Sequence, residues 1–396
     1  MKHIIWHKIV YAFLWLGFTA YYKLFHNYHF RIYRPKSKTY LVLSNHNSDG
    51  DQFMVGIPLV RHMYYVASEH LFRQGLASKL IRFLAAPIVR KKGNEGKSTI
   101  KDITYALDHG ANVCLFVEGN RSFNGETGWI SSSNGALVKN SGAGLITFRL
   151  DGGYLRTPRW AAYRRKGPEY GHVIHEYTKE DLASMTEDEV TEAIKRDVYT
   201  NAYTFQKEHP EKYTGKNLAE HLETLLFVCP KCHGIDTMTS IGDRFYCSCG
   251  LDLKINEYCF FESSGKGPVP FETVYDWDKW QRSYLKENIG SIKKEYTDKP
   301  FFSHERQMLS RINIMKDTDL MCEGKMELFS DRLEITGPDC KNVFTLNDIA
   351  AISVTKMMTL FFSTKDGGYY EIKSESIRTG VGYVMMYRYL TGKDYI

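Results

Sequence analysis

Short apolar runs alternate with longer amphipathic ones between Thr39 and about Leu225, and this alternation constrains the fold more than any other feature. Runs of four to eight apolar residues are typical of buried strands, and apolar residues at helical spacing are typical of packed helices. The expected elements are strands at 39–44 and 113–117 and helices at 69–85, 97–108 and 186–208, the last charged and exposed. Strands that alternate with helices predict an α/β domain over residues 39–225.

After this domain the alternation of apolar runs ends and the residue composition changes. Residues 226–262 hold four clustered cysteines, and 263–319 are an aromatic stretch that we interpret as a linker. Residues 320–396 predict a β-rich domain, with short strands joined by tight turns such as Asp366-Gly367 and a closing helix from about Ser374 to Leu390. Its expected strands are KMELF, RLEIT, NVFTL, AAISV, TLFFST and YYEIK.

Residues 1–38 precede the α/β domain and carry a basic, apolar segment. The first acidic residue of the chain is Asp49, whereas cations flank the 14-residue run IVYAFLWLGFTAYY (9–22). This run is shorter than the roughly 20 residues that span a bilayer as a helix. Aromatic bulk between cations favours a helix that lies in the membrane interface. A core helix, a signal peptide and a true span are the alternatives, whereas a mean hydropathy of −0.38 excludes a polytopic membrane protein.

The stretch SNHNSDGD (44–51) follows the first expected strand directly and places His46 and Asp51 five positions apart. On one continuous helix their side chains would diverge by roughly 140°. They can meet only if His46 precedes a helix and Asp51 lies in its first turn, with Asn47, Ser48 and Asp49 as capping residues. A carboxylate on one ring nitrogen would fix the tautomer and leave the other as a general base. A capping loop with a surface histidine is the alternative.

Two further stretches supply candidate phosphate contacts. VCLFVEGNRS (113–122) ends a strand in Glu118 and Gly119, where a ligand can approach the backbone closely, and in Arg121, whose planar fork suits phosphate. APIVRKKG (86–93) ends an apolar run in Arg90, a second candidate clamp. Solvated arginines in turns are the alternative in both places.

Together these stretches resemble the glycerolipid acyltransferase family, which includes the lysophosphatidic acid acyltransferases. The family's NHxxxxD motif matches Asn45, His46 and Asp51, and its FPEGTRS motif matches Phe116, Glu118, Gly119, Arg121 and Ser122. Arg90 and an expected proline-containing strand, LRTPRWA around Pro158, are weaker matches to the remaining two motifs. Val117 and Asn120 depart from the family's proline and threonine, which leaves the acceptor's identity in doubt.

The resemblance implies an enzyme that moves a fatty acyl group from a thioester donor, acyl-CoA or acyl carrier protein, to a lysophospholipid. His46 would be the general base and Asp51 its partner, while Arg90, Glu118, Gly119 and Arg121 would bind substrate. The implied acceptor is the sn-2 hydroxyl of 1-acyl-sn-glycerol-3-phosphate, which gives phosphatidic acid at the cytoplasmic face of a membrane. Another lysolipid or alcohol acceptor, a hydrolase and an inactive lipid-binding scaffold are the alternatives.

CPKC (229–232) and CSC (247–249) bracket a short insert and resemble a zinc ribbon. Four thiolates on two turns fit one tetrahedral Zn²⁺ with a structural role, which also indicates a reducing compartment. The expected ligands are Cys229, Cys232, Cys247 and Cys249, and because the second pair is C-x-C, His233 or Cys259 could replace one of them. Such ribbons also occur in nucleic-acid binders, but the surrounding acidic residues argue against nucleic acid as a partner.

Two further expectations concern lipid binding. The strands and final helix of residues 320–396 resemble a pleckstrin-homology-like or GRAM-like module in pattern only, and a generic small β domain is the alternative. The basic run of Arg156, Arg159, Arg164, Arg165 and Lys166 lies beside Tyr154, Trp160 and Tyr163. We expect this run to contact anionic headgroups, with a solvated face as the alternative.

Overall fold

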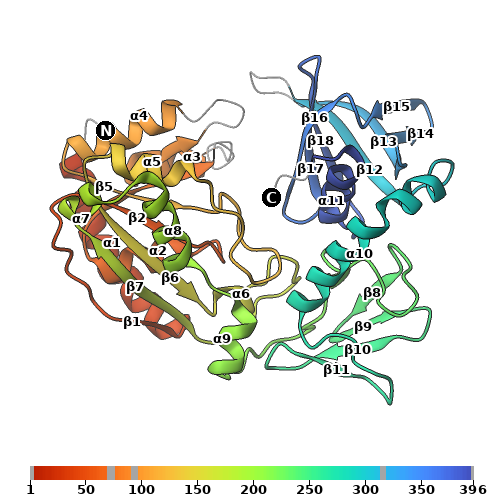
Figure 1. The fold of residues 1–396 in the computed structure, drawn as a ribbon, viewed down its shortest axis with the longest axis horizontal. Coiled ribbons are helices and arrows are strands. Elements are labelled where there is room, and N and C mark those ends of the chain that lie inside the picture. Colours follow the sequence, from red (N-terminus) through yellow and green to blue (C-terminus); the bar gives the residue numbers. More distant parts are fainter. Residues whose placement is uncertain (1–3, 69–75, 91–96, 313–317, 394–396) are drawn as a thin grey trace. The chain divides into compact units, whose positions relative to one another are not determined.

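The computed structural model describes residues 4–68, 76–90, 97–312 and 318–393. The chain divides into two compact units, of which the first comprises residues 1–158 and 166–213. The second comprises residues 159–165 and 214–396, and each unit is described by itself (Figure 1).

The first unit is built on a seven-stranded sheet with strand order β1-β7-β6-β2-β5-β3-β4. Its strands are β1 (Tyr28–Phe30), β2 (Tyr40–Ser44), β3 (Met63–Ser68), β4 (Ile88–Arg90), β5 (Asn112–Phe116), β6 (Gly144–Asp151) and β7 (Glu169–Tyr177). All neighbouring pairs are parallel except β6 and β7. The predicted α/β fold is therefore confirmed.

Helices cover both faces of this sheet (Figure 1). They are α1 (Ile4–Phe25), α2 (Asp51–Leu59), α3 (Leu76–Leu84), α4 (Lys97–Asp108), α5 (Ser133–Asn140), α6 (Gly153–Arg156), α7 (Lys179–Ser184), α8 (Glu187–Val198) and α9 (Ala202–Glu208). Leu41 and Leu43 of β2 pack in a core that includes α4 and α8, while Val42 packs with α2 on the other face. A central parallel strand buried on both faces needs apolar residues at every position, as in TYLVLS.

Two expectations within this unit need correction. The stretch 186–208 forms two helices rather than one, and Val190, Ile194 and Val198 of α8 are buried because the helix covers the sheet. Pro158 lies in no strand: it follows α6, and the preceding strand β6 ends at Asp151. The part of the expected helix at 69–75 lies outside the described residues.

Helix α1 is 22 residues long and, by length and composition, apolar enough to cross a membrane. It packs along α2, and its aromatic polar tips donate to carbonyl oxygens in the last turn of that helix. The Tyr11 hydroxyl donates to Gly56 O (2.8 Å) and the Trp15 indole N–H to Ile57 O (3.0 Å). A helix end leaves such carbonyls without an intrahelical partner, so α1 completes α2. The side chains on the opposite face of α1 are exposed.

The second unit contains a four-stranded antiparallel sheet in the order β11-β10-β9-β8. Its strands are β8 (Met238–Ile241), β9 (Arg244–Cys247), β10 (Asp252–Ile255) and β11 (Phe261–Ser263). The stretch 263–319, expected to be a linker, instead contains α10 (Val274–Glu295) and β12 (Phe302–Ile312). Trp277 of α10 is fully buried and its indole N–H donates to Val228 O (2.9 Å), so α10 is part of the core of this unit.

The C-terminal part of the second unit is a seven-stranded antiparallel sheet in the order β15-β14-β13-β12-β18-β17-β16. Its other strands are β13 (Thr318–Leu328), β14 (Arg332–Gly337), β15 (Cys340–Thr345), β16 (Ile349–Thr355), β17 (Thr359–Thr364) and β18 (Tyr369–Ser374). Helix α11 (Gly380–Thr391) follows and buries most of its length. The predicted β-rich region with a final helix is confirmed, although its first strand begins earlier than residue 320.

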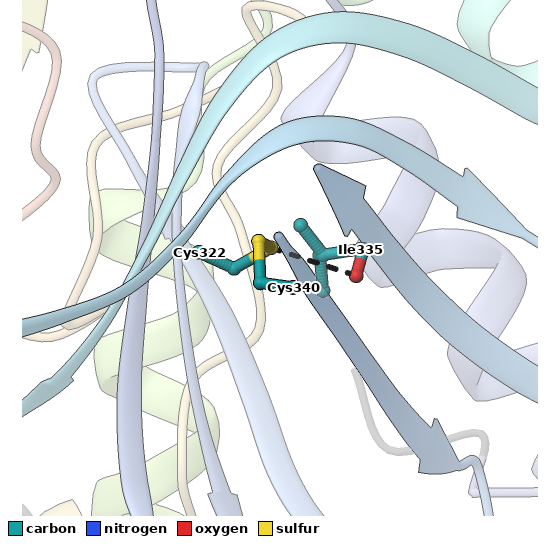
Figure 2. Close-up of a disulfide and its surroundings, with 3 residues drawn as sticks. All are labelled: Cys322, Ile335 and Cys340. Atoms are coloured by element: carbon teal, nitrogen blue, oxygen red, sulfur yellow. Dashed lines mark hydrogen bonds between the residues drawn. A yellow bond between two sulfur atoms is a disulfide. The ribbon is translucent and has the colours of Figure 1, made fainter. Parts of the chain in front are cut away.

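A disulfide joins Cys322 of β13 to Cys340 of β15 (Figure 2). The Cys322 sulfur also lies 3.8 Å from the carbonyl oxygen of Ile335 in β14, the strand between them. The bond was not expected, because the two cysteines show no recognisable spacing, and it disagrees with the reducing compartment inferred from the thiol cluster. Cys340 lies at the turn between β14 and β15, so the bond ties this turn to β13.

We expect the double variant Cys322→Ala, Cys340→Ala to lower the free energy of unfolding of the second unit by about 3 kcal/mol. The bond closes a loop with a sequence separation of 18 residues, and a loop of this length limits the unfolded chain by roughly that amount. Chemical denaturation with and without a dithiol reductant measures the effect. Equal midpoints for the wild type under both conditions would show that the bond contributes nothing.

Candidate active site

The loop that follows β2 is fixed by hydrogen bonds to both neighbouring strands. Asn45 is fully buried, and its side-chain amide donates to Leu150 O and accepts from Leu150 N, both at 2.8 Å. The amide thereby continues the pairing of β2 with β6 after the backbone has turned away. On the other side, Val117 N donates to Ser44 O (3.1 Å). These hydrogen bonds fix the position of the loop where it begins, at the carboxyl end of β2.

His46 and Asp51 meet in this loop. The His46 Nδ1 lies 2.8 Å from a carboxylate oxygen of Asp51. Asp51 is fully buried at the start of α2, and it also accepts from the backbone N–H groups of Asn47 (2.5 Å) and Ser48 (2.9 Å) and from the Ser48 hydroxyl (2.5 Å). These donors hold the carboxylate in one position. The His46 side chain is 22% exposed, so the ring is not sealed in the core.

The N-terminal cap of α2 differs from the expected one. The capping residue of α2 is Gly50, which has no side chain to offer, rather than Asn47, Ser48 or Asp49. Asn47 and Ser48 instead donate to the carboxylate of the first helical residue. Two of the three residues suggested as helix caps, Asn47 and Ser48, thus orient Asp51, whereas Asp49 pairs with Arg121.

Glu118 lies at the end of β5 and holds the backbone of the catalytic candidate. Its carboxylate accepts from the N–H of His46 (2.7 Å) and from the N–H of Gly128 (2.6 Å). Burial raises the pKa of Glu118 to about 7, although these two donors oppose the change. Glu118 therefore fixes two loops to each other rather than projecting toward a ligand.

Gly119 and Arg90 lie in contact. Gly119 has a φ of +66°, and a Cβ added there would lie 2.9 Å from Nη1 of Arg90. The left-handed conformation favours glycine at this position, and a larger residue would also displace the end of the Arg90 side chain. The side chain of Arg90 is exposed, so the guanidinium remains accessible beside the turn that bears Glu118.

Arg121 follows in the same turn and forms an ion pair with Asp49 (3.2 Å). The backbone N–H of Ser122 donates to His46 O (2.9 Å), which ties the arginine-bearing turn to the histidine loop. The structure therefore brings together His46, Asp51, Glu118, Gly119, Arg90 and Arg121 at one edge of the sheet.

Three contributors to this site were missed by sequence reasoning. Phe116 stacks on the His46 ring with centroids 4.3 Å apart, Gly128 supplies a donor to Glu118, and Asp49 pairs with Arg121. Phe116 was identified only as part of a motif. The Gly128 contact had no sequence signal because it depends on a loop returning to the site.

The basic run 156–166 does not form one cationic surface. Arg156 pairs with the buried carboxylate of Glu169, and Arg165 is 3% exposed and donates to Leu218 O (2.8 Å). Trp160 and Tyr154 are also buried. Arg156 and Arg165 are therefore not available to anionic headgroups. Arg164 and Lys166 are exposed, so the expected headgroup contact stays a prediction for these two side chains.

A separate cluster of thiols lies in the second unit. The sulfur atoms of Cys229, Cys232, Cys247 and Cys249 all lie within 4.8 Å of one another, so the cluster could hold a metal ion. Neither alternative ligand belongs to it. The His233 ring packs against Tyr284 (centroids 4.8 Å apart), and the Cys259 sulfur lies 3.0 Å from the Arg165 guanidinium.

Comparison with known proteins gives one match by family. Residues 26–150 match the family model described as Acyltransferase, and no curated protein matches the chain. Among solved structures, the chain is similar to the 1-acyl-sn-glycerophosphate (LPA) acyltransferase PlsC from Thermotoga maritima, with 17% identity over 53% of this chain and 81% of that chain and a TM-score of 0.41. It is also similar to the C-terminal domain of an unknown protein from Leishmania infantum, with 12% identity over 28% of this chain and 98% of that chain and a TM-score of 0.18. The match to the family model confirms, for residues 26–150, the resemblance to an acyltransferase domain stated above.

Proposed function

We propose that the first unit transfers a fatty acyl group from a thioester donor, acyl-CoA or acyl carrier protein, to the hydroxyl of a lysophospholipid. As the hydroxyl oxygen attacks the thioester carbonyl, Nε2 of His46 takes its proton. The carbon–oxygen bond forms, the carbon–sulfur bond breaks, and the proton passes to the leaving thiolate. Asp51 stabilises the imidazolium that forms in between. The products are an ester and a free thiol.

The observation that carries this proposal is the hydrogen bond between His46 Nδ1 and the buried carboxylate of Asp51 (2.8 Å). With Nδ1 on the carboxylate, Nε2 is the ring nitrogen that can act as the general base. The direct test supplies purified protein with labelled thioester donors and a panel of lysolipids, and separates the products by mass. Free fatty acid without any ester product would indicate a hydrolase instead.

The acceptor carries a phosphate in this proposal. Arg90 and Arg121 offer guanidinium groups beside the turn at Gly119, and bidentate guanidinium contacts suit phosphate oxygens. The family resemblance implies 1-acyl-sn-glycerol-3-phosphate as acceptor and phosphatidic acid as product. A lysolipid with another headgroup is the alternative.

We propose that the protein lies at the cytoplasmic face of a membrane, and the exposed face of α1 supports the interfacial position. Its most exposed apolar side chains are Ile5, Phe13, Leu16, Leu24 and Phe25. Phe83 of α3 is also exposed and its ring contacts Trp6 of α1, with centroids 5.6 Å apart, so the apolar surface continues onto a second helix. Such a helix, docked on its protein along one face and apolar on the other, suits peripheral or monotopic binding.

We expect the double variant Phe13→Glu, Leu16→Glu to bind lipid vesicles about tenfold or more weakly than the wild type. The two side chains are 77% and 65% exposed, so their contribution comes from membrane burial rather than from the fold. Co-sedimentation with vesicles measures the change. Ile241→Glu, at an exposed apolar position on β8 and outside the proposed lipid-binding module, is the control, and equal losses in both variants would contradict the proposal.

We further propose that the four thiols of the second unit bind one structural Zn²⁺. Tetrahedral Zn–S bonds of about 2.3 Å require sulfur atoms about 3.8 Å apart. The Cys229–Cys249 and Cys232–Cys247 sulfur pairs lie 3.6 and 3.8 Å apart, which supports the fit. With four protein ligands the ion has no open position, so its role is to stabilise β8–β11 and the two cysteine turns.

The C-terminal sheet and α11 are proposed to form a lipid-binding module of the pleckstrin-homology-like or GRAM-like kind. A four-stranded meander, β12–β15, and a three-stranded meander, β16–β18, join through β12 and β18, and a helix follows. This order of elements supports the proposal. We assign the module to residues from Phe302 onward, in place of the boundary at 320.

A further inference from the structure

The ion pair between Arg121 and Asp49 is an unexpected feature of a phosphate-binding site. The guanidinium lies 3.2 Å from the Asp49 carboxylate, and the two side chains are 19% and 70% exposed. Asp49 belongs to the same loop as His46 and Asp51, three residues after the proposed base. A carboxylate thus lies where a phosphate bound to Arg121 would have to approach.

The remaining acidic groups of the site differ from Asp49 in their surroundings. Asp51 is fully buried and is held by His46 and by three donors of the loop. Glu118 accepts two backbone N–H groups. Because Asp49 is mostly exposed, its carboxylate can turn away from Arg121 toward a bound headgroup, whereas the other two are fixed.

We propose that Asp49 selects the acceptor by the charge of its headgroup and favours zwitterionic lysophospholipids over phosphomonoesters. This inference rests on the proposed acyl transfer. A zwitterionic headgroup presents a phosphodiester with a single negative charge to Arg121 and an ammonium group to Asp49. Both charges of the Arg121–Asp49 pair are then matched when the pair opens.

A phosphomonoester such as lysophosphatidic acid meets the same pair less favourably. Near neutral pH its phosphate carries a charge of about −1.5 to −2, and it brings no cation for Asp49. The displaced carboxylate stays close to the phosphate, and like charges a few ångströms apart repel, although water weakens the effect at an exposed position. This repulsion weakens binding of the phosphomonoester but not of the zwitterion, so it changes the preference between the two acceptors.

The test compares lysophosphatidic acid with lysophosphatidylethanolamine carrying the same acyl chain, with a saturating thioester donor. We expect the wild type to use the zwitterionic acceptor at least as efficiently. In Asp49→Asn, the ratio of kcat/KM for the phosphomonoester to kcat/KM for the zwitterion should rise about fivefold, equivalent to about 1 kcal/mol. Asp49→Glu keeps the charge and should keep the wild-type ratio.

Asp102→Asn removes the same charge from an exposed position on α4 and is the matched control. A ratio that stays unchanged in Asp49→Asn, or that rises equally in Asp102→Asn, overturns the inference while acyl transfer itself stands. A wild type that prefers the phosphomonoester also overturns it. Absence of ester product with every lysolipid contradicts the proposed function instead, and the inference falls with it.

Discussion

His46→Ala should lower kcat for acyl transfer by about a hundredfold to ten-thousandfold, the usual contribution of a positioned general base. No other group in the described part of the site takes its place: Asp51 is fully buried, and the Glu118 carboxylate is engaged by two backbone N–H groups. Initial rates with labelled thioester donor and lysolipid measure the loss. Asp51→Asn should also reduce kcat strongly, because an amide cannot stabilise the imidazolium as a carboxylate does.

The control for this experiment is His109→Ala, which removes an exposed imidazole directly after α4. Circular dichroism should give the same spectrum for all three variants, since the His46 side chain is partly exposed and its removal leaves no large cavity. Transfer at the wild-type rate by a folded His46→Ala protein would overturn the assignment of the base.

The double variant Cys229→Ser, Cys247→Ser should lose the metal and unfold the β8–β11 sheet. Structural zinc in small cysteine-rich domains contributes apparent free energies of about 10–16 kcal/mol, and a sheet of four short strands has little core with which to replace it. Elemental analysis should give about one zinc per chain for the wild type and well under one for the variant. Hydrogen exchange should accelerate over β8–β11.

Cys259→Ser and His233→Ala are the matched controls, since both side chains lie near the cluster in sequence but outside it in space. Both variants should retain the full metal content. Loss of metal in either one would restore the alternative ligand set, and a wild type without bound zinc would contradict the metal site altogether.

Local pattern was sufficient for much of the first unit. The apolar run TYLVLS predicted β2 within one residue, and the spacing of 97–108 predicted α4. Local patterns do not predict helices and strands whose formation depends on tertiary contacts. Helix α10 and strand β12 mix polar and aromatic residues, so their apolar residues follow neither a helical nor a strand period. The burial of Trp277 depends on its contact with Val228, which is distant in the sequence.

The cysteines illustrate the same division. Four of them stand in paired turns, so their spacing reveals them. Cys322 and Cys340 are brought together by the path of β13–β15, and no local spacing encodes that path. The apolar run of 14 residues likewise underestimated α1, because the helix also includes the flanking residues 4–8 and 23–25. Among them His7 contacts the Tyr64 hydroxyl of β3 (2.9 Å), a contact that the sequence does not reveal.

The sequence by itself determined the order of chemical groups: a histidine and a carboxylate in one short loop, an arginine after a buried strand, and two pairs of thiols. Only the tertiary structure decided which of these groups touch. Strands 2 and 5 lie side by side although some 70 residues separate them, and this pairing places the backbone N–H of His46 on Glu118. The same fold pairs Arg121 with Asp49. Contacts between distant segments depend on the packing of the whole sheet, which no local pattern of residues specifies.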